Sequence, residues 1–354
     1  MSHFDLQRLP TIDQLKQKLN IVDPGSGNVH QGHLALGLHV DDIEAQHAVV
    51  NAHNKVQFNT GVEMPDMVYR GQIQEFNPCV PGLGRLEHLE EKLVAVCRNV
   101  AFEDAIRVHP YVNYCSKQIF NGHSLHVDYQ GLAQHYGFHT NMLDVTSNFD
   151  VAMFFACCEW NPKEGCYLPV STRAQPGVIY GAPPALFSMG EFQLGAEFSI
   201  VGWQPLPRPG QQRAGAFTLR PGQCFTKLPG VKKAYFRHDK DVAEKVWRAF
   251  DGGSALFPND EAAELSRIAQ NLDVVTETQL ARAWQMLEKW EGKSFKKKRR
   301  KNTLKGSGLK IVKKAPLNWD RYNLPSMPEK LHARFNSELN NIRFRLAYKS
   351  PCKT

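Results

Sequence analysis

The order of hydrophobic periodicities along the chain is the feature that most constrains this fold. Apolar residues recur at helical spacing in residues 85–99, 128–136 and 150–158. Residues 177–237 instead contain short β-like runs separated by Pro, Gly and Ser, and helical spacing returns at residues 239–291. Because strands and helices are grouped and not alternating, the sequence predicts an α+β fold with an antiparallel sheet.

Two elements of this pattern are specific enough to place. Residues 67–73 are a predicted strand, bounded by Pro65-Asp66 before it and a Pro/Gly-rich loop after it. The helix at residues 150–158 (DVAMFFACC) is apolar almost all round, which is typical of a helix buried on most sides. Since Ser147 lies three residues before Asp150, at capping-box spacing, we expect this helix to begin at Ser147.

The two ends of the chain are predicted to be extensions. Residues 1–50 are expected to form a helical lead-in, with helical spacing at 11–20 and again at 41–55. Residues 293–354 are expected to be a flexible basic linker followed by a helix at 328–348.

Composition excludes several classes of protein. The chain has 354 residues, of which 42% are hydrophobic, so it can form a core and is not expected to be disordered. No stretch of eighteen apolar residues occurs and the first residues lack a secretory pattern, which predicts a cytoplasmic protein with no membrane contact. The eight cysteines show no CxxC spacing, so we expect reduced thiols and no metal site.

Charge is distributed unevenly along the chain. The net charge is +8, but residues 293–354 hold 18 Lys and Arg against three acids, whereas residues 1–292 hold 25 against 32. The longest run of cations comprises Lys296, Lys297, Lys298, Arg299, Arg300 and Lys301. With its neighbours in residues 293–314, this run predicts binding to nucleic acid or another polyanion. The alternative is a solvated linker without a partner.

A candidate ligand contact lies on the predicted strand at 67–73, in Tyr69-Arg70-Gly71-Gln72. A guanidinium group offers five donors and keeps its charge, so Arg70 is suited to a diphosphate or a ribose phosphate. Gly71 would let a ligand approach the backbone closely. The alternative is an Arg70 held in a structural ion pair.

The helix at 128–136 carries the next candidates, in Gln134-His135-Tyr136-Gly137. His135 lies off the apolar stripe and is a candidate base or donor to a sugar hydroxyl, with a structural hydrogen bond as the alternative. Tyr136 is suited to stacking on a planar ring, although its spacing first predicts a core residue. Gln134 is interpreted either as part of the cleft wall or as a residue that fixes a loop by hydrogen bonding.

Thr146 and Ser147 precede the buried helix, where hydroxyl groups and free N–H groups can bind a ribose or a phosphate. The alternative is that Ser147 caps the helix and Thr146 stabilises the turn. Asp144 is interpreted as a carboxylate that either pairs with Arg70 or orders the turn.

In their order and spacing, four segments resemble the FRG domain. They are Tyr69-Arg70-Gly71-Gln72, Gln134-His135-Tyr136-Gly137, residues 141–156 and Leu256-Phe257-Pro258. The resemblance covers residues 51–272, and it leaves a helical extension at 273–292 and the basic segment outside the family pattern. Asn141-Met142, Val145 and residues 213–217 depart from the family pattern.

The FRG pattern in turn is distantly similar to the ADP-ribosyltransferase superfamily, which implies a split antiparallel sheet with surrounding helices. The resemblance implies NAD as the co-substrate and a cleft formed by Tyr69, Arg70 and Gly71 with Thr146 and Ser147. It also implies a carboxylate that holds the ribose 2′-hydroxyl. Glu191 and Glu197 are the nearest acids in the strand-rich stretch. The late segment, residues 211–217, matches the family's late motif, contains no acid and offers Gln212 or Arg213 for the cleft wall.

Two functions follow from these patterns. The first is an ADP-ribosyltransferase-like enzyme that uses NAD to modify a macromolecule, either nucleic acid or protein, with His135 and a glutamate as catalytic candidates. The second is a non-catalytic module that binds a nucleotide or a peptide and is tethered to nucleic acid by its basic tail. A protein target or inhibitor is a possible partner in either case.

Overall fold

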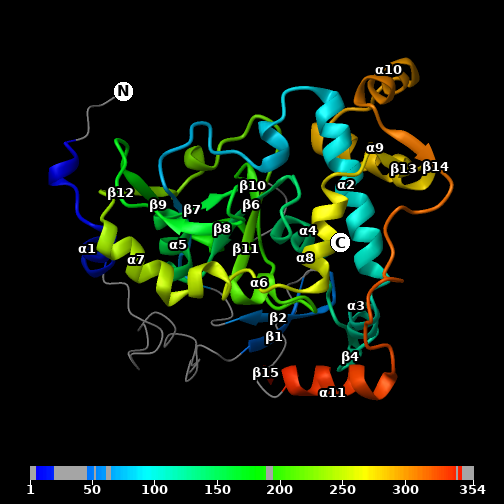
Figure 1. Ribbon diagram of the computed structural model, residues 1–354, viewed down its shortest axis with the longest axis horizontal. Coiled ribbons are helices and arrows are strands. Elements are labelled where there is room, and N and C mark those ends of the chain that lie inside the picture. Colours follow the sequence, from blue (N-terminus) through cyan, green and yellow to red (C-terminus); the bar gives the residue numbers. More distant parts are fainter. Residues whose placement is uncertain are drawn as a thin grey trace.

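The computed structural model describes residues 5–19, 46–51, 53–60, 65–188, 194–339 and 342–344. Their architecture is a central sheet with helices packed against it, and a second helical layer to one side (Figure 1). The expected α+β class is therefore confirmed.

The central sheet has six strands in the order β10-β11-β6-β3-β9-β12, and every neighbouring pair is antiparallel. The strands are β3 (Val68–Gln72), β6 (Met142–Thr146), β9 (Gly177–Ala182), β10 (Ala196–Ile200), β11 (Ala214–Leu219) and β12 (Lys232–Phe236). Among the β-like runs expected within residues 177–237, the one at 223–227 is not a strand, because Phe225–Lys227 form a single 3-10 turn with Phe225 buried.

The sheet is nearly divided in its middle. β3 pairs with β9 over five residues, but its registered pairing with β6 is limited to Tyr69 opposite Thr146. Beyond this pair the two strands no longer share a ladder. The polar backbone of β6 therefore becomes available to side chains at this point.

One face of the sheet is covered by α5 (Phe149–Cys157), which packs on β3 and β9. α7 (Lys240–Ala249) lies against α5, and α1 (Ile12–Lys18) completes the same apolar cluster. Strand alternation accounts for the two-sided burial, because Ile179 joins this cluster while Val178 and Tyr180 join the cluster on the opposite face.

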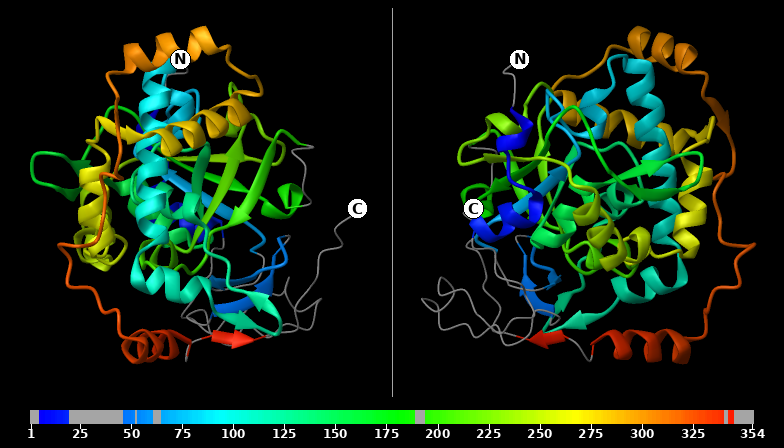
Figure 2. Two further views of the ribbon diagram at one scale, coloured as in Figure 1. Left: turned by 90° about the vertical axis from the view of Figure 1, so that its right-hand side faces the viewer. Right: turned by 60° about the vertical axis from the view of Figure 1, so that its left-hand side comes forward.

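The helical layer packs around α2 (Leu89–Arg107), and Figure 2 shows this helix extending along one side of the molecule. α4 (Tyr129–His135), α8 (Glu261–Ala269), α9 (Glu277–Glu291) and α10 (Lys297–Ser307) contact it. The remaining elements are α3 (Pro110–Ser116), α6 (Arg208–Gln211), the hairpins β4–β5 (Ile119–Phe120, His123–Ser124) and β7–β8 (Cys158–Asn161, Cys166–Pro169), and the parallel pair β13–β14 (Val274–Thr276, Lys310–Val312).

The terminal segments differ from the expectations. Residues 20–45 lie outside the described residues, and the helix expected over 41–55 is wrong in its described part, where β1 (Gln46–Val50) pairs with β2 (Val56–Thr60). The last helix, α11 (Pro328–Leu339), ends before 348, and β15 (Ile342–Phe344) then pairs in parallel with β1. Tertiary strand pairing thus overrides local helical spacing at both places.

The start of α5 is also corrected. The helix begins at Phe149, and the side chain of Asn148 accepts hydrogen bonds from the amides of Asp150 and Val151. Asn148 is therefore the N-cap in place of Ser147, since asparagine is as effective a cap as serine and stands one residue closer.

Within the described residues, no helix combines the length and the apolar character that crossing a membrane requires.

α5 approaches the sheet closely at Gly71. A Cβ atom added there would lie 1.8 Å from the carbonyl oxygen of Ala152 and 3.0 Å from the Cβ of Ala156. Gly71 is thus required by helix packing, and it also lines the cavity described below.

We predict that Gly71→Ala lowers the free energy of unfolding by at least about 2 kcal/mol, because the strand and the helix must separate. Urea denaturation measures the change. Gly84→Ala is the matched control, because its nearest neighbour would lie 3.5 Å away, in ordinary contact, and its expected change stays within about 0.5 kcal/mol. Equal loss in the two variants would contradict the prediction.

Candidate functional site

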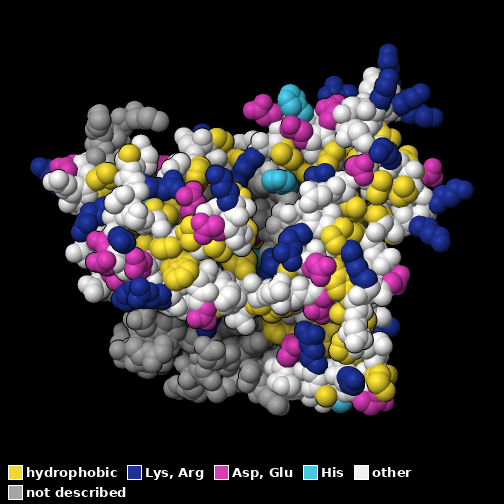
Figure 3. Space-filling model, in the orientation of Figure 1, with side chains coloured by type: hydrophobic (Ala, Val, Ile, Leu, Met, Phe, Trp, Pro, Cys, Tyr) yellow, Lys and Arg dark blue, Asp and Glu magenta, His cyan; other side chains and the backbone are white. Residues whose placement is uncertain are grey.

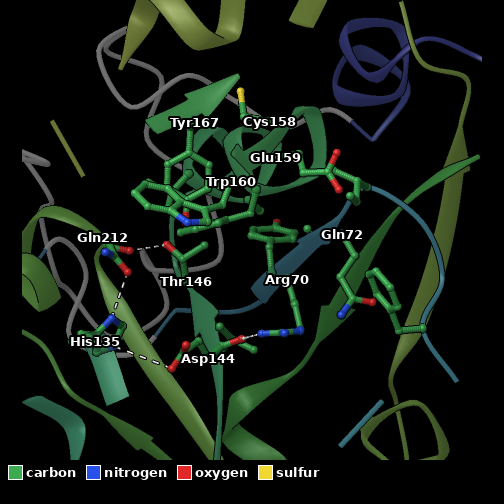
Figure 4. A pocket seen from close by; sticks show the side chains of 18 of the residues that line it. Arg70, Gln72, His135, Asp144, Thr146, Cys158, Glu159, Trp160, Tyr167 and Gln212 are labelled. Atoms are coloured by element: carbon green, nitrogen blue, oxygen red, sulfur yellow. Dashed lines mark hydrogen bonds and ion pairs between the residues drawn. The ribbon is translucent and has the colours of Figure 1, made fainter. Parts of the chain in front are cut away.

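A cavity of about 650 Å³ opens where the sheet is nearly divided. Its lining comes from β3, β6, α5 and the β7–β8 hairpin, and from His135 and Gln212, which are distant in sequence (Figure 4). This volume falls within the range of small-molecule sites. The cavity brings Arg70 and Thr146 together although seventy-five residues separate them.

Arg70 bridges the gap between β3 and β6. Its Nη1 donates a hydrogen bond of 2.7 Å to the backbone carbonyl of Asp144, at a position where the two strands have ceased to pair. This contact is with the backbone, and so differs from the ion pair considered for Arg70 and Asp144. This hydrogen bond holds the guanidinium at the cavity wall. Because the acceptor is a neutral carbonyl, the bond does not neutralise the positive charge of Arg70.

A chain of polar side chains orders the opposite wall. His135 Nδ1 lies 2.9 Å from Gln212 Oε1, and Gln212 Nε2 donates to the carbonyl of Leu256 over 2.9 Å. Thr146 Oγ1 donates to the carbonyl of Gln212 over 2.8 Å and accepts from the amide of Asn148. Gln212 thereby ties four segments together, and all three side chains are buried.

Three buried polar atoms of these lining residues lack a hydrogen-bond partner among the described residues. They are Arg70 Nε, His135 Nε2 and Asp144 Oδ1. All three atoms are buried behind the cavity surface, so their lack of a partner does not by itself indicate a ligand. The guanidinium groups of Arg70 and Arg85 in the lining suit an anionic ligand.

The rim of the cavity is aromatic, which the sequence analysis did not identify. Figure 4 shows Trp160 beside Tyr167; their ring centroids lie 5.3 Å apart, and the Trp160 side chain is half exposed. Phe257 stacks on Tyr167 at 5.1 Å with an interplanar angle of 18°. The Trp247 indole N–H donates to the carbonyl of Tyr167 over 2.7 Å and so fixes the hairpin. A planar ring could stack on this rim.

Three further lining residues carry potential chemistry. Arg85 adds a second guanidinium, whose pKa is lowered by partial burial and by the nearby charge of Arg70. Glu159 is an exposed carboxylate at the rim and forms an ion pair with Arg173. Burial raises the pKa of Cys158 to about 12, so this thiol stays protonated and is a poor nucleophile at neutral pH.

Several predicted site residues lie away from the cavity lining. Tyr136 is fully buried and donates to Asp260 over 2.6 Å, and Arg208 lies over its ring. Gln134 lies behind the wall, where its Nε2 donates to Asp144 Oδ2 over 3.0 Å. Ser147 borders a separate, much smaller hollow beside β10 and β11. Helical spacing already favoured a core position for Tyr136.

The two candidate glutamates do not supply the expected carboxylate here. Glu197 lies exposed on β10, opposite Thr218 of β11 and outside the cavity lining, so it is not positioned to act on a ligand there. Glu191 lies outside the described residues. Asp144 and Glu159 are the carboxylates that line the cavity.

The basic block is a helix, which corrects the expectation of a flexible linker. Arg300 forms an ion pair with Glu288 at 2.7 Å, and Thr303 of the same helix is buried, so α10 is anchored on one face. The other cations of the block are exposed: Lys296, Lys297, Lys298, Arg299 and Lys301. Figure 3 shows Lys and Arg side chains projecting where Figure 1 places α10.

Comparison with known proteins supports one family. The model of the FRG domain matches residues 65–165. This match includes the Tyr69-Arg70-Gly71 strand, the Gln134 to Gly137 helix end and the segment that leads into α5. The chain therefore contains an FRG domain, as its sequence predicted, while the wider boundaries of 51–272 stay a prediction. No curated protein and no solved structure matches the chain.

Metal ligation has no support from side-chain clusters: among the described residues, no group of three or more His, Cys, Asp or Glu side chains is arranged to hold an ion.

We predict that Thr146→Val lowers the free energy of unfolding by about 1–3 kcal/mol, because the Gln212 carbonyl and the Asn148 amide lose their partner. Chemical denaturation measures this. Ser147→Ala is the neighbouring control and is expected to change stability by less than about 0.5 kcal/mol, since Asn148 caps α5. A larger effect at Ser147 than at Thr146 would mean that the hydrogen-bond assignment is wrong.

Proposed function

We propose that this FRG-domain chain binds an NAD-type dinucleotide in the cavity and transfers ADP-ribose from it to a macromolecule. One observation carries the proposal: two arginines and an aromatic rim line the same hollow of about 650 Å³. Guanidinium groups suit a diphosphate, and aromatic rings suit the planar bases at either end of a dinucleotide.

The arrangement of the motifs gives further support. An aromatic-Arg-Gly strand lies beside a Thr-Ser turn that leads into an apolar helix, and the sheet is nearly divided between them. This order is similar to that of ADP-ribosyltransferases. Fold likeness alone does not decide function, so the proposal depends on the lining residues.

The roles follow from the contacts. Arg70 and Arg85 bind the diphosphate, while Trp160 and Tyr167 bind a ring. Thr146 already uses its proton and one lone pair within the protein, so it shapes the wall and offers at most one further acceptor site.

The reaction is a substitution at the ribose C1′ carbon. The bond from C1′ to the nicotinamide nitrogen breaks and its electron pair leaves with nicotinamide. A nucleophile of the acceptor, or water, forms the new bond and releases its proton to a base or to solvent.

We predict that Arg70→Ala weakens binding of NAD at least about tenfold, because a charge-assisted hydrogen bond is lost. Isothermal calorimetry measures the affinity. Arg98→Ala is the matched control: Arg98 also donates to a backbone carbonyl, that of Leu272 over 2.9 Å, but lies outside the cavity lining. Equal weakening by both variants, or no binding of NAD by the unaltered protein, would contradict the proposal.

A second candidate is binding without turnover, with α10 as the contact to nucleic acid. Gln212 favours this second candidate. It lies in the cavity wall, and its amide cannot act as an anion. Release of free nicotinamide distinguishes an enzyme from a binding module.

We predict that duplex DNA binds α10 with a strong dependence on salt. In a plot of the logarithm of the binding constant against the logarithm of the salt concentration, each phosphate contact adds about −0.9 to the slope. The triple change of Lys297, Lys298 and Lys301 to Glu should remove about three such contacts. The control reverses three exposed lysines elsewhere, Lys117, Lys163 and Lys232. An unchanged slope in the α10 variant would exclude this helix as the contact.

A further inference from the structure

Two cysteines that are distant in sequence, Cys79 and Cys224, lie side by side next to the cavity wall. Cys79 follows Asn77-Pro78 of the cavity lining, and its carbonyl accepts a hydrogen bond of 2.8 Å from the amide of Phe225. The amide of Cys79 in turn faces the Cys224 sulfur. Backbones joined in this way place facing Cα atoms about 4.5–5.5 Å apart, and a disulfide requires about 4.4–6.8 Å. Both thiols are free, so the pair is a disulfide site in its reduced form.

The two thiols differ in reactivity. Burial raises the pKa of the Cys79 thiol, and the nearby charge of Arg70 only partly opposes this. Burial acts on Cys224 too, but hydrogen bonds from Thr226 and from the Cys79 amide hold the pKa of Cys224 below its ordinary value. Cys224 also keeps 8% of its surface exposed and follows an exposed turn at residues 220–222, whereas Cys79 keeps 2%. Cys224 is therefore the thiol that meets an oxidant first.

The loop that carries Cys79 holds both arginines of the cavity. The Arg70 guanidinium lies within hydrogen-bonding reach of the Cys79 sulfur. The carbonyl of the next residue, Val80, accepts a hydrogen bond of 3.2 Å from Arg85 Nε. A covalent change at Cys79 thus acts on a loop that positions the charged part of the cavity wall.

We propose that Cys79 and Cys224 form a reversible disulfide when the protein meets a peroxide. The Cys224 thiolate attacks one peroxide oxygen, the O–O bond breaks, and the hydroxide that leaves takes up the proton released by Cys224. The Cys79 sulfur then attacks the sulfenic acid on Cys224. The S–S bond forms, the S–O bond breaks, and hydroxide leaves with the Cys79 proton as water. Both sulfurs are oxidised, and hydrogen peroxide is reduced to two water molecules.

The disulfide would tie the loop at residues 77–80 to the segment that follows β11. The two segments are now joined by hydrogen bonds, which open and close, and the covalent bond would prevent them from separating. Oxidation therefore restrains the cavity wall and the loop that contacts Arg70 and Arg85, and reduction releases them. The cavity thereby responds to the redox state of two thiols that lie outside its lining.

The first test treats the full chain with hydrogen peroxide, blocks the remaining thiols with iodoacetamide and digests the protein without reductant. Mass spectrometry should find the peptides of Cys79 and Cys224 joined, with two hydrogen atoms fewer than their sum, and dithiothreitol should separate them. Cys79→Ser and Cys224→Ser should each abolish this product. Cys166→Ser is the matched control and should retain it, because Cys166 is the described cysteine that is not buried and lies on the β7–β8 hairpin.

The second test measures amide hydrogen exchange at residues 79–84, where the amides of Leu83 and Gly84 are hydrogen-bonded. Exchange there should be slower by about threefold or more in the oxidised protein than in the reduced protein. Exchange in α3, at residues 110–116, should not change.

Three outcomes would overturn the inference. In the first, peroxide leaves both thiols free. In the second, it converts Cys224 to a sulfinic acid or joins it to a different cysteine. In the third, the disulfide forms while exchange at residues 79–84 stays the same, which would contradict the link to the cavity wall. Both measurements work on the unaltered chain, so they stand even where a serine variant does not fold. Neither involves NAD, so the result is independent of the proposed function.

Discussion

The hydrogen bond from Arg70 to the Asp144 carbonyl is the contact on which the cavity depends. Between β3 and β6, only Tyr69 and Thr146 form a registered pair, so the sheet would otherwise expose unpaired backbone in its middle. Arg70 satisfies the Asp144 carbonyl with its side chain, at a position where the backbones of β3 and β6 do not pair. The strands remain apart, and the space between them opens into the cavity that carries the polar groups.

The late segment, residues 211–217, contributes rigidity and no carboxylate. Gln212 connects His135, Thr146 and Leu256 through its side chain and its carbonyl. A glutamate at this position would lose the donor that Leu256 requires. The amide is therefore suited to holding the histidine ring in one orientation, and negative charge at the cavity comes from Asp144 and Glu159.

Sequence patterns predicted the parts of this site that local chemistry determines. An Arg on a strand, a His off an apolar stripe and a Thr before a buried helix all line the cavity, and the FRG motifs identified the family. The aromatic rim was missed because the position of Trp160 depends on contacts of its hairpin with Trp247 and Phe257, which are far apart in sequence. Likewise, α10 has too few apolar residues to be predicted as a helix, and its ion pair with Glu288 is visible only in three dimensions.

The parallel pairing of β15 with β1 brings segments from opposite ends of the sequence together, because His47 lies opposite Arg343. β15 thereby replaces the five-residue edge strand β1 with a three-residue edge strand, which offers fewer open N–H and C=O groups to another chain. A protein shortened before residue 342 would expose the edge of β1, and copies could join strand to strand. The C-terminal strand thus limits the open edge on this side of the small sheet to three residues.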